Sequence, residues 1–293
     1  MTGVIFALLS AVLFGLYIVP RKLSKLPAVQ FSTLMAFSFT IGSILLYVLQ
    51  ITIGNNEGLY DPDLWYAVLA GILWATALVL LVKSIDIIGI ARSNQWKNLQ
   101  GPVGVILALI ILGEATSVNP WFAVLSGFAI FGSAVIFNIS SDKHNKEANK
   151  RAIILAALSG VLFGTVSLIN KHVTDSAGVY SQQVIWSISI LLSLVTYQLV
   201  TNQWSGNLLK HGRDTFFGLS SGVLYLGASA FMLLSFERME ASIAFTIIQM
   251  NFIIVVLLGI FVFKEFSFKG NQIRILFGLI FATVGVILLS LAR

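Results

Sequence analysis

Long stretches without any charged residue constrain the fold of this chain more than any other feature. No Asp, Glu, Lys or Arg occurs within residues 115–141, 176–209 or 241–263. Each stretch can hold the about 20 apolar residues that cross about 30 Å of hydrocarbon. Composition agrees, since 57% of the residues are hydrophobic, 10% are charged and the mean hydropathy is +0.93. Apolar residues run continuously instead of alternating with polar ones, so the sequence predicts an all-α integral membrane protein without strands.

Charge clusters and polar loops divide the chain into ten predicted transmembrane helices. The longest polar linker, SSDKHNKEANK, lies at the midpoint of the chain. We therefore expect a first five-helix repeat in residues 1–139, a polar linker in 140–150 and a second five-helix repeat in 151–293. The predicted spans are Gly3–Val19, Ala28–Ile53, Leu64–Val82, Ile88–Leu112, Pro120–Ile139, Ala152–Ile169, Gly178–Val200, Phe216–Ser235, Ala241–Phe263 and Ile273–Leu291.

The two halves resemble each other in sequence. VIFALLSAVLFGLYIVPRK, starting at Val4, aligns with IILAALSGVLFGTVSLINK, starting at Ile153. Each half has an odd number of spans, so the second must enter the membrane from the opposite side, which gives inverted repeats. Such repeats favour alternating access around a site near the middle of the membrane. In the fourth and ninth spans, at an offset of 151 residues, Asn98 matches Gln249, Gln100 matches Asn251 and Glu114 matches Glu265.

The plan of five plus five spans resembles the drug/metabolite transporter superfamily. Two motifs carry the resemblance: FGLYIVPRK, which closes the first span, and GE at residues 113–114, which ends the fourth. The first motif is similar to the glucose/ribose porter and rhamnose transporter branch. The resemblance implies a sugar transporter with a central cavity lined by spans one to four and six to nine.

The fourth predicted span contains the polar segment ARSNQWKNLQG at residues 91–101. Asn94, Lys97, Asn98 and Gly101 follow the i, i+3, i+4, i+7 spacing of one helix face. An ammonium group at the centre of a membrane helix costs about 2.5 to 3.5 kcal/mol on insertion scales. This face must therefore look at protein or water, and we expect it to bind substrate.

The predicted binding site suits a polyhydroxylated ligand. Amide side chains offer paired donors and acceptors to hydroxyl groups, and an indole can stack on the apolar face of a pyranose. Serine and threonine side chains in such spans also form ordinary hydrogen bonds between helices. The candidate substrate-binding residues are Lys97, Asn94, Asn98, Trp96, Gln100, Gln249, Thr246, Asn251, Tyr17 and Trp186, with Ser242, Trp74, Gln183 and Tyr225 as further candidates.

Three further residues in or just after the fourth span have separate interpretations. Arg92 lies near the predicted start of the span, where snorkelling to the headgroups explains it as well as a site does. Pro102 removes a backbone donor, so we expect a kink near Gly101. Glu114 and its counterpart Glu265 are expected to have a structural role at helix ends.

No carboxylate lies deep within a predicted span, which removes the usual proton carrier. A carboxylate at the end of a span, His172 or Lys97 could carry a coupled proton. Alternatively, the protein could be a facilitator without proton coupling. The chain has no Cys, no metal-ligand cluster and no phosphate-binding glycine loop, so the sequence predicts no cofactor, no bound metal and no enzyme activity.

Monosaccharide transport is the leading functional prediction. The alternatives are export of amino acids or other small metabolites, a sugar-phosphate carrier, and a membrane interaction protein that transports nothing. Lys and Arg gather on one side of the predicted membrane, which places both termini outside the cytoplasm of a multi-pass cell membrane protein. The net charge of +6 has the same origin and implies no nucleic-acid partner. We expect the lipid bilayer and a sugar as partners, and a monomer, with a homodimer as the alternative.

Overall fold

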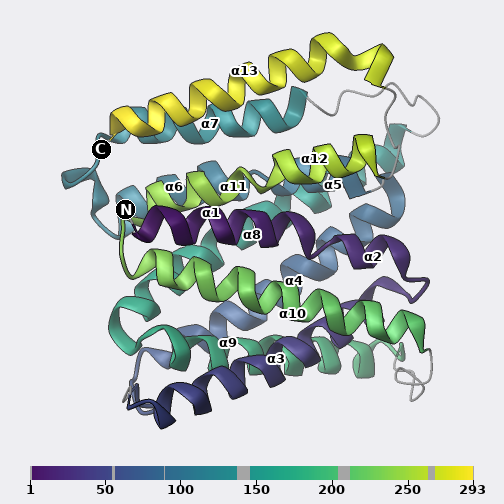
Figure 1. The fold of residues 1–293 in the computed structure, drawn as a ribbon. Helices are drawn as coiled ribbons and strands as arrows, with labels where there is room; N and C mark the ends of the chain where they lie inside the picture. Colours follow the sequence, from purple (N-terminus) through teal and green to yellow (C-terminus); the bar gives the residue numbers. More distant parts are fainter. Residues whose placement is uncertain are drawn as a thin grey trace. The chain divides into compact units, whose positions relative to one another are not determined.

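The computed structural model of the chain describes residues 2–54, 57–88, 90–136, 146–203, 212–262 and 268–292. These residues form helices, with no strand among them, which confirms the predicted all-α class (Figure 1). Six of the described helical segments are long and apolar enough to cross a membrane. They are α1 (Thr2–Leu16) with α2 (Val19–Leu23), α3 (Ala28–Thr52), α4 (Leu64–Ile88), α8 (Lys146–Ala177), α9 (Val179–Val200) and α10 (Arg213–Phe236).

The predicted spans four, five, nine and ten correspond to helices outside this set of six. Predicted spans four and nine each correspond to two helices with a break between them. A total of ten crossings therefore stays a prediction. The helices concerned are α5 (Ile90–Lys97), α6 (Gln100–Ile111), α7 (Pro120–Ile136), α11 (Ala241–Gln249), α12 (Asn251–Phe261) and α13 (Phe268–Ala292), with a short 3-10 turn, η1 (Glu114–Thr116), after α6.

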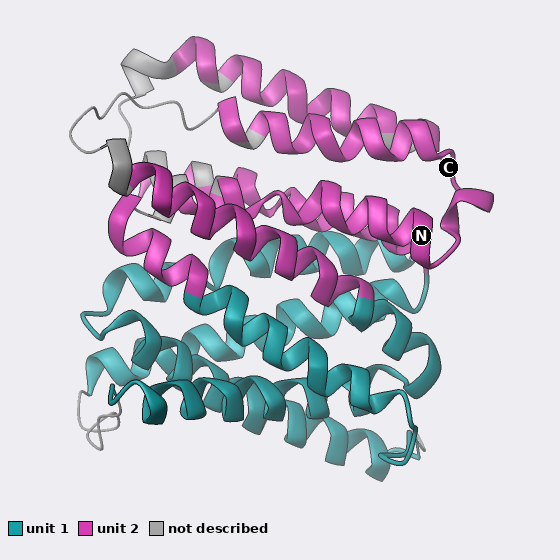
Figure 2. Cartoon of the chain, turned by 180° about the vertical axis from the view of Figure 1, so that it is seen from behind, with its two compact units in different colours: residues 1–79, 169–238 teal, residues 80–168, 239–293 magenta. Residues whose placement is uncertain are grey.

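The chain separates into two compact units, coloured in Figure 2. Unit 1 contains residues 1–79 and 169–238, and unit 2 contains residues 80–168 and 239–293. Each unit thus takes segments from both halves of the sequence. The predicted repeats rest on sequence similarity and not on spatial contact, so that division stays a prediction. One boundary does differ, since α8 begins at Lys146, inside the predicted linker.

In unit 1, α10 packs on α1, α2 and α3, and α3 also packs on α9. Serine hydroxyl groups form hydrogen bonds to backbone carbonyls of the neighbouring segment. Ser10 donates to the carbonyl of Ala228 at 2.8 Å, and Ser221 donates to that of Tyr17 at 2.7 Å. Close approach at small residues and interhelical hydrogen bonds replace the hydrophobic effect when helices associate in lipid. This packing is the kind that a membrane bundle needs.

In unit 2, α13 packs on α7 in the antiparallel sense. Ser126 donates to the carbonyl of Gly285 at 2.8 Å, and Ser133 donates to that of Gly278 at 2.6 Å. The same unit brings α11 against α6 and α12 against α5. The divided helices therefore lie in one unit and pack on each other.

Large apolar side chains are exposed along the long helices of both units. Leu45 is 64% exposed, Leu192 60% and Ile273 71%. Soluble monomers rarely expose contiguous apolar surface on this scale, whereas lipid is a suitable neighbour for it. Together with the six long apolar helices, this identifies the chain as a membrane protein.

Candidate functional site

The break between α5 and α6 lies at Asn98 and Leu99, one turn before Pro102. Proline has no N–H to donate to the carbonyl four residues earlier, which here belongs to Asn98, and its ring clashes with that carbonyl. The Asn98 carbonyl instead accepts the N–H of Gly101 at 3.1 Å. The predicted kink is therefore present, but it is a two-residue turn and lies slightly before Gly101.

The break between α11 and α12 lies at Met250 and has a different cause. No proline follows it within α12. The side-chain amide of Asn251 donates to the carbonyl of Ile248 at 2.8 Å, and the N–H of Ile253 turns back to the carbonyl of Met250 at 3.0 Å. A side chain thus occupies a carbonyl near the end of α11 and competes with continuation of the helix.

The two divided helices match in register. After the breaks, α6 begins at Gln100 and α12 at Asn251. These starts differ by 151 residues (251 − 100), which is the offset that aligns these spans in sequence.

Glycines bring the neighbouring helices close to the two breaks. A Cβ atom at Gly101 would lie 2.9 Å from Cγ of Gln249, so α6 and α11 touch there. On α8, a Cβ at Gly160 would lie 2.6 Å from the carbonyl oxygen of Lys97, and one at Gly164 would lie 3.0 Å from that of Gln100. Real Cβ contacts are not this short, so each position requires glycine unless its neighbours move.

Lys97 is the last residue of α5 and is buried, with 8% of its surface exposed. Its ammonium nitrogen lies 5.6 Å from the centre of the Phe163 ring of α8, within the range of a cation–π interaction. Phe163 lies between the two glycines that hold α8 against the break. Within the described residues, no carboxylate forms an ion pair with Lys97.

Asn98 and Gln249 are buried amides with unused hydrogen-bonding capacity. Neither Oδ1 nor Nδ2 of Asn98 has a hydrogen-bond partner among the described residues, and Oε1 of Gln249 also lacks one there. A buried polar atom without a partner costs about 1 to 3 kcal/mol, and native structures contain few of them. Asn98 and Gln249 are therefore two amides of the predicted site in unit 2 with capacity left for a ligand.

Other predicted residues of unit 2 are engaged elsewhere or only half-buried. The Thr246 hydroxyl donates to the carbonyl of Ser242 at 3.0 Å, within its own helix. The Trp96 ring lies edge-on to Phe131 of α7, with 6.4 Å between ring centres. Asn94 and Gln100 are half-buried. The side chain of Arg92 lies outside the described part of the structure.

Tyr17 and Trp186 belong to unit 1 and meet in an aromatic cluster. Tyr225 of α10 is its centre, and five other rings have their centres 5.0 to 6.2 Å from that of Tyr225. We call this group the Tyr225 cluster: Phe14, Tyr17, Phe39, Trp74, Trp186 and Tyr225.

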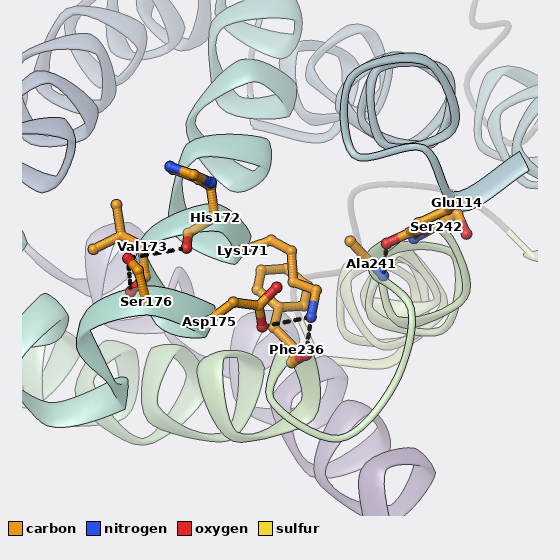
Figure 3. Close-up of polar contacts among 9 residues, drawn as sticks. All are labelled: Glu114, Lys171, His172, Val173, Asp175, Ser176, Phe236, Ala241 and Ser242. Carbon is orange, nitrogen blue, oxygen red and sulfur yellow. Dashed lines mark hydrogen bonds and ion pairs between the residues drawn. The ribbon is translucent and has the colours of Figure 1, made fainter. Parts of the chain in front are cut away.

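Glu114 has the structural role that its position at a helix end predicted. Its carboxylate is buried and accepts the N–H groups of Ala241 at 2.7 Å and Ser242 at 3.0 Å, as Figure 3 shows. Negative charge at a helix N-terminus is favourable because unpaired N–H groups and the helix dipole converge there. The counterpart, Glu265, lies outside the described residues.

An equivalent carboxylate in unit 1 was not expected from the sequence. Glu57 accepts the N–H groups of Tyr180 at 2.7 Å and Ser181 at 3.1 Å, at the start of α9. Gly178, immediately before α9, has φ +89° and no room for a Cβ against Glu57. The sequence signal was this glycine before a predicted span, but nothing local connects it with an acid 121 positions earlier (178 − 57).

Of the candidate proton carriers, His172 is about half exposed at its side chain. Its Nε2 lies 3.5 Å from the Asp63 carboxylate. The neighbouring Lys171 donates to the Asp175 carboxylate at 2.7 Å and to the Phe236 carbonyl at 2.6 Å, as Figure 3 shows.

A family model described as Sugar transport protein matches residues 130–292, which is more than half of the chain. The chain belongs to this family. It is accordingly a transporter and not an enzyme. Within the residues that the structure describes, no group of His, Cys, Asp and Glu could hold a metal ion.

Relatives of this sugar transport family member carry similar descriptions. "Probable glucose uptake protein GlcU" of Bacillus cereus is 22% identical over 291 residues, which cover 92% of this chain and 98% of that relative. "Glucose uptake protein GlcU" of Bacillus subtilis is 22% identical over 233 residues, covering 77% and 78%. A solved crystal structure superposes with a TM-score of 0.73 at 13% identity, covering 98% of this chain and 97% of the other. That likeness shows the fold.

Proposed function

We propose that this protein is a secondary transporter of a neutral monosaccharide, which it binds around the breaks of α5–α6 and α11–α12. Sugar transport is the description of its family, and its relatives are named for glucose uptake. Unpaired Asn98 carries the assignment to particular residues. A sugar hydroxyl both donates and accepts hydrogen bonds. Two vicinal hydroxyls can therefore pair with the free oxygen and the free nitrogen of one amide side chain.

Lys97 and Gln249 also belong to the proposed site. Gln249 offers a free acceptor, and the Lys97 ammonium offers donors beside the Phe163 ring. Asn94, Gln100, Thr246 and Asn251 provide further polar groups around the breaks, and Trp96 borders them. Ligands of transporters bind where helices are discontinuous, because peptide groups are free there. The proposed site combines such discontinuities with buried amides.

We further propose that the chain contains two inverted five-helix repeats of the drug/metabolite transporter type and works by alternating access. The matching register of the two divided helices supports a repeat. Both termini lie outside the cytoplasm in this proposal, because Lys and Arg gather on the other side.

A sugar-phosphate carrier is the second candidate function. The observation that favours it is Lys97, a buried cation without an ion-pair partner among the described residues. Against it, the sequence of α11 and α12 contains no basic residue that could provide a second charge for a phosphate. The two functions differ in ligand charge, which a binding experiment separates.

The test is ligand-dependent thermal stability of the purified protein in detergent. Free hexoses and pentoses, sugar phosphates and amino acids are compared, since a ligand that binds only the folded state raises the melting temperature with its concentration. We expect stabilisation by a free sugar, lost in Asn98→Leu and reduced in Lys97→Met. Lys150→Met, at an exposed position, is the matched control. Stabilisation by sugar phosphates alone would favour the second candidate, and stabilisation by amino acids alone would contradict both.

A further inference from the structure

The Tyr225 cluster contains polar atoms that an ordinary aromatic core would not need. Trp186 and Gln183 are buried, with 1% and 2% of their surfaces exposed. Nε1 of Trp186 and Oε1 of Gln183 have no hydrogen-bond partner among the described residues. By contrast, the Trp74 side chain is a hydrogen-bond partner of the Tyr225 hydroxyl. One indole of the cluster is therefore paired and the other is not.

The two unpaired atoms come from the same face of α9. Trp186 follows Gln183 by three residues, a spacing that places both side chains on one side of a helix. Both side chains also meet α10: the Gln183 amide nitrogen lies 3.3 Å from the Ser229 hydroxyl, and the centres of the Trp186 and Tyr225 rings are 6.2 Å apart. Because Tyr225 and Ser229 are one turn apart on α10, Trp186 and Gln183 line the same contact between these helices.

An unpaired donor and an unpaired acceptor on one helix face match the chemistry of a single hydroxyl group. A hydroxyl accepts one hydrogen bond and donates another, so it can accept the Trp186 N–H and donate to the Gln183 carbonyl. The aromatic rings of the cluster provide faces for the C–H groups of a sugar ring. All the described residues of the cluster are uncharged, so a neutral ligand fits better than an ionic one.

We propose that the Tyr225 cluster recognises the sugar, with aromatic rings stacked on it and one of its hydroxyls bridging Trp186 and Gln183. This inference rests on the proposed function, because it takes a neutral monosaccharide as the ligand. Its residues belong to unit 1, whereas Asn98 belongs to unit 2. The rings touch one another in the present structure, so a bound sugar must displace at least one of them.

Tryptophan fluorescence provides the test, because displacement of rings around Trp186 changes the surroundings of an indole. Purified protein is titrated with D-glucose, first as wild type and then as Trp186→Phe, which keeps a ring but removes the N–H. Trp65→Phe is the matched control, because Trp65 is 77% exposed and outside the cluster. We expect wild type and Trp65→Phe to respond equally. Trp186→Phe should lose most of the response and, by thermal shift, bind about ten-fold more weakly, as loss of one hydrogen bond predicts.

Gln183→Leu and deoxy sugars separate recognition from a structural role. Without sugar, the melting temperature of each variant is measured as its own baseline, because Gln183→Leu also removes the amide that donates to Ser229 and Trp186→Phe leaves space in a buried core. Each monodeoxy analogue of glucose is then titrated. The analogue that lacks the bridging hydroxyl should bind wild type about ten-fold more weakly than glucose, and this difference should be smaller in Trp186→Phe, which keeps only the Gln183 acceptor.

The outcomes distinguish this inference from the proposed function. If wild type binds glucose, and both Trp186→Phe and Gln183→Leu bind it with unchanged affinity, the cluster is packing and the inference is overturned while the function stands. If wild type binds no free sugar in either assay, the proposed function fails and takes the inference with it.

Discussion

The carboxylate of Glu114 accepts the backbone N–H of Ala241 at 2.7 Å and so caps a helix that begins 127 residues later in the chain. The bond joins the end of one divided helix to the start of the other. Because the helix α11 that it caps also carries Gln249, Glu114 holds part of the proposed sugar site in place without facing it.

Replacing Glu114 by Ala should lower thermal stability. The substitution leaves the N–H groups of Ala241 and Ser242 without their acceptor in a buried place, which costs about 2 kcal/mol or more. Melting of the purified variant measures the effect. Glu237→Ala is the control, because Glu237 is exposed and its pairing with Arg238 at 3.7 Å contributes little. Equal melting temperatures for the two variants would contradict a capping role.

Replacing Pro102 by Ala should partly close the break between α5 and α6. The new N–H can donate to the Asn98 carbonyl, which removes the cause of the turn. We expect slower amide hydrogen exchange around residues 99–102 and weaker sugar binding. Pro120→Ala serves as the control, because Pro120 is the first residue of α7, where a backbone donor is not needed. Unchanged exchange in Pro102→Ala would show that the tertiary packing alone maintains the break.

Replacing Gly160 by Ala should disturb the end of α5. The added methyl would lie 2.6 Å from the Lys97 carbonyl, so backbone must move. We expect a loss of roughly 1 to 3 kcal/mol of stability, as for other overpacked positions. Gly58→Ala is the control for replacing glycine by alanine, since a Cβ at Gly58 would lie 3.7 Å or more from its neighbours, an ordinary contact distance. A normal melting temperature together with normal sugar uptake would show that α8 can shift freely.

Introduced cysteines should report the orientation of the chain in the membrane, because the native chain contains no cysteine. In intact cells, a membrane-impermeant maleimide should label Tyr60→Cys, whose native side chain is 96% exposed between the second and third predicted spans, on the same side as the N-terminus in this proposal. Lys25→Cys should be labelled only after the membrane is opened, because it lies on the basic side. The reverse pattern would place both termini in the cytoplasm.

Much of the helical arrangement follows from the sequence because apolar length and charge limit where a span can begin. The predicted starts at Ala28, Leu64 and Pro120 agree with the observed starts of α3, α4 and α7, and the predicted end at Val200 agrees with that of α9. The break at Met250 was not predicted. It depends on a side-chain hydrogen bond from Asn251, a residue that also occurs inside continuous helices.

The sequence could predict that residues of the candidate site are buried, but not which side chains they contact. The cost of a buried ammonium pointed to Lys97, and its burial agrees. Stacking of Trp96 on a sugar stays a prediction, and the structure adds that its ring lies edge-on to Phe131 of α7. Helical spacing shows which residues share a face, yet it does not show which neighbouring helix that face meets. For the same reason, the sequence did not predict the contact between Glu57 and the start of α9.

The two helix breaks differ in how easily they could be undone. A helix that continued through Pro102 would lose a hydrogen bond and suffer a clash, at a cost of about 3 kcal/mol, so that fewer than about one molecule in a hundred would adopt it. Continuation through Met250 needs the Asn251 side chain to release one carbonyl, a net cost of about 1 kcal/mol. On this comparison the break between α11 and α12 costs less to undo than the break between α5 and α6.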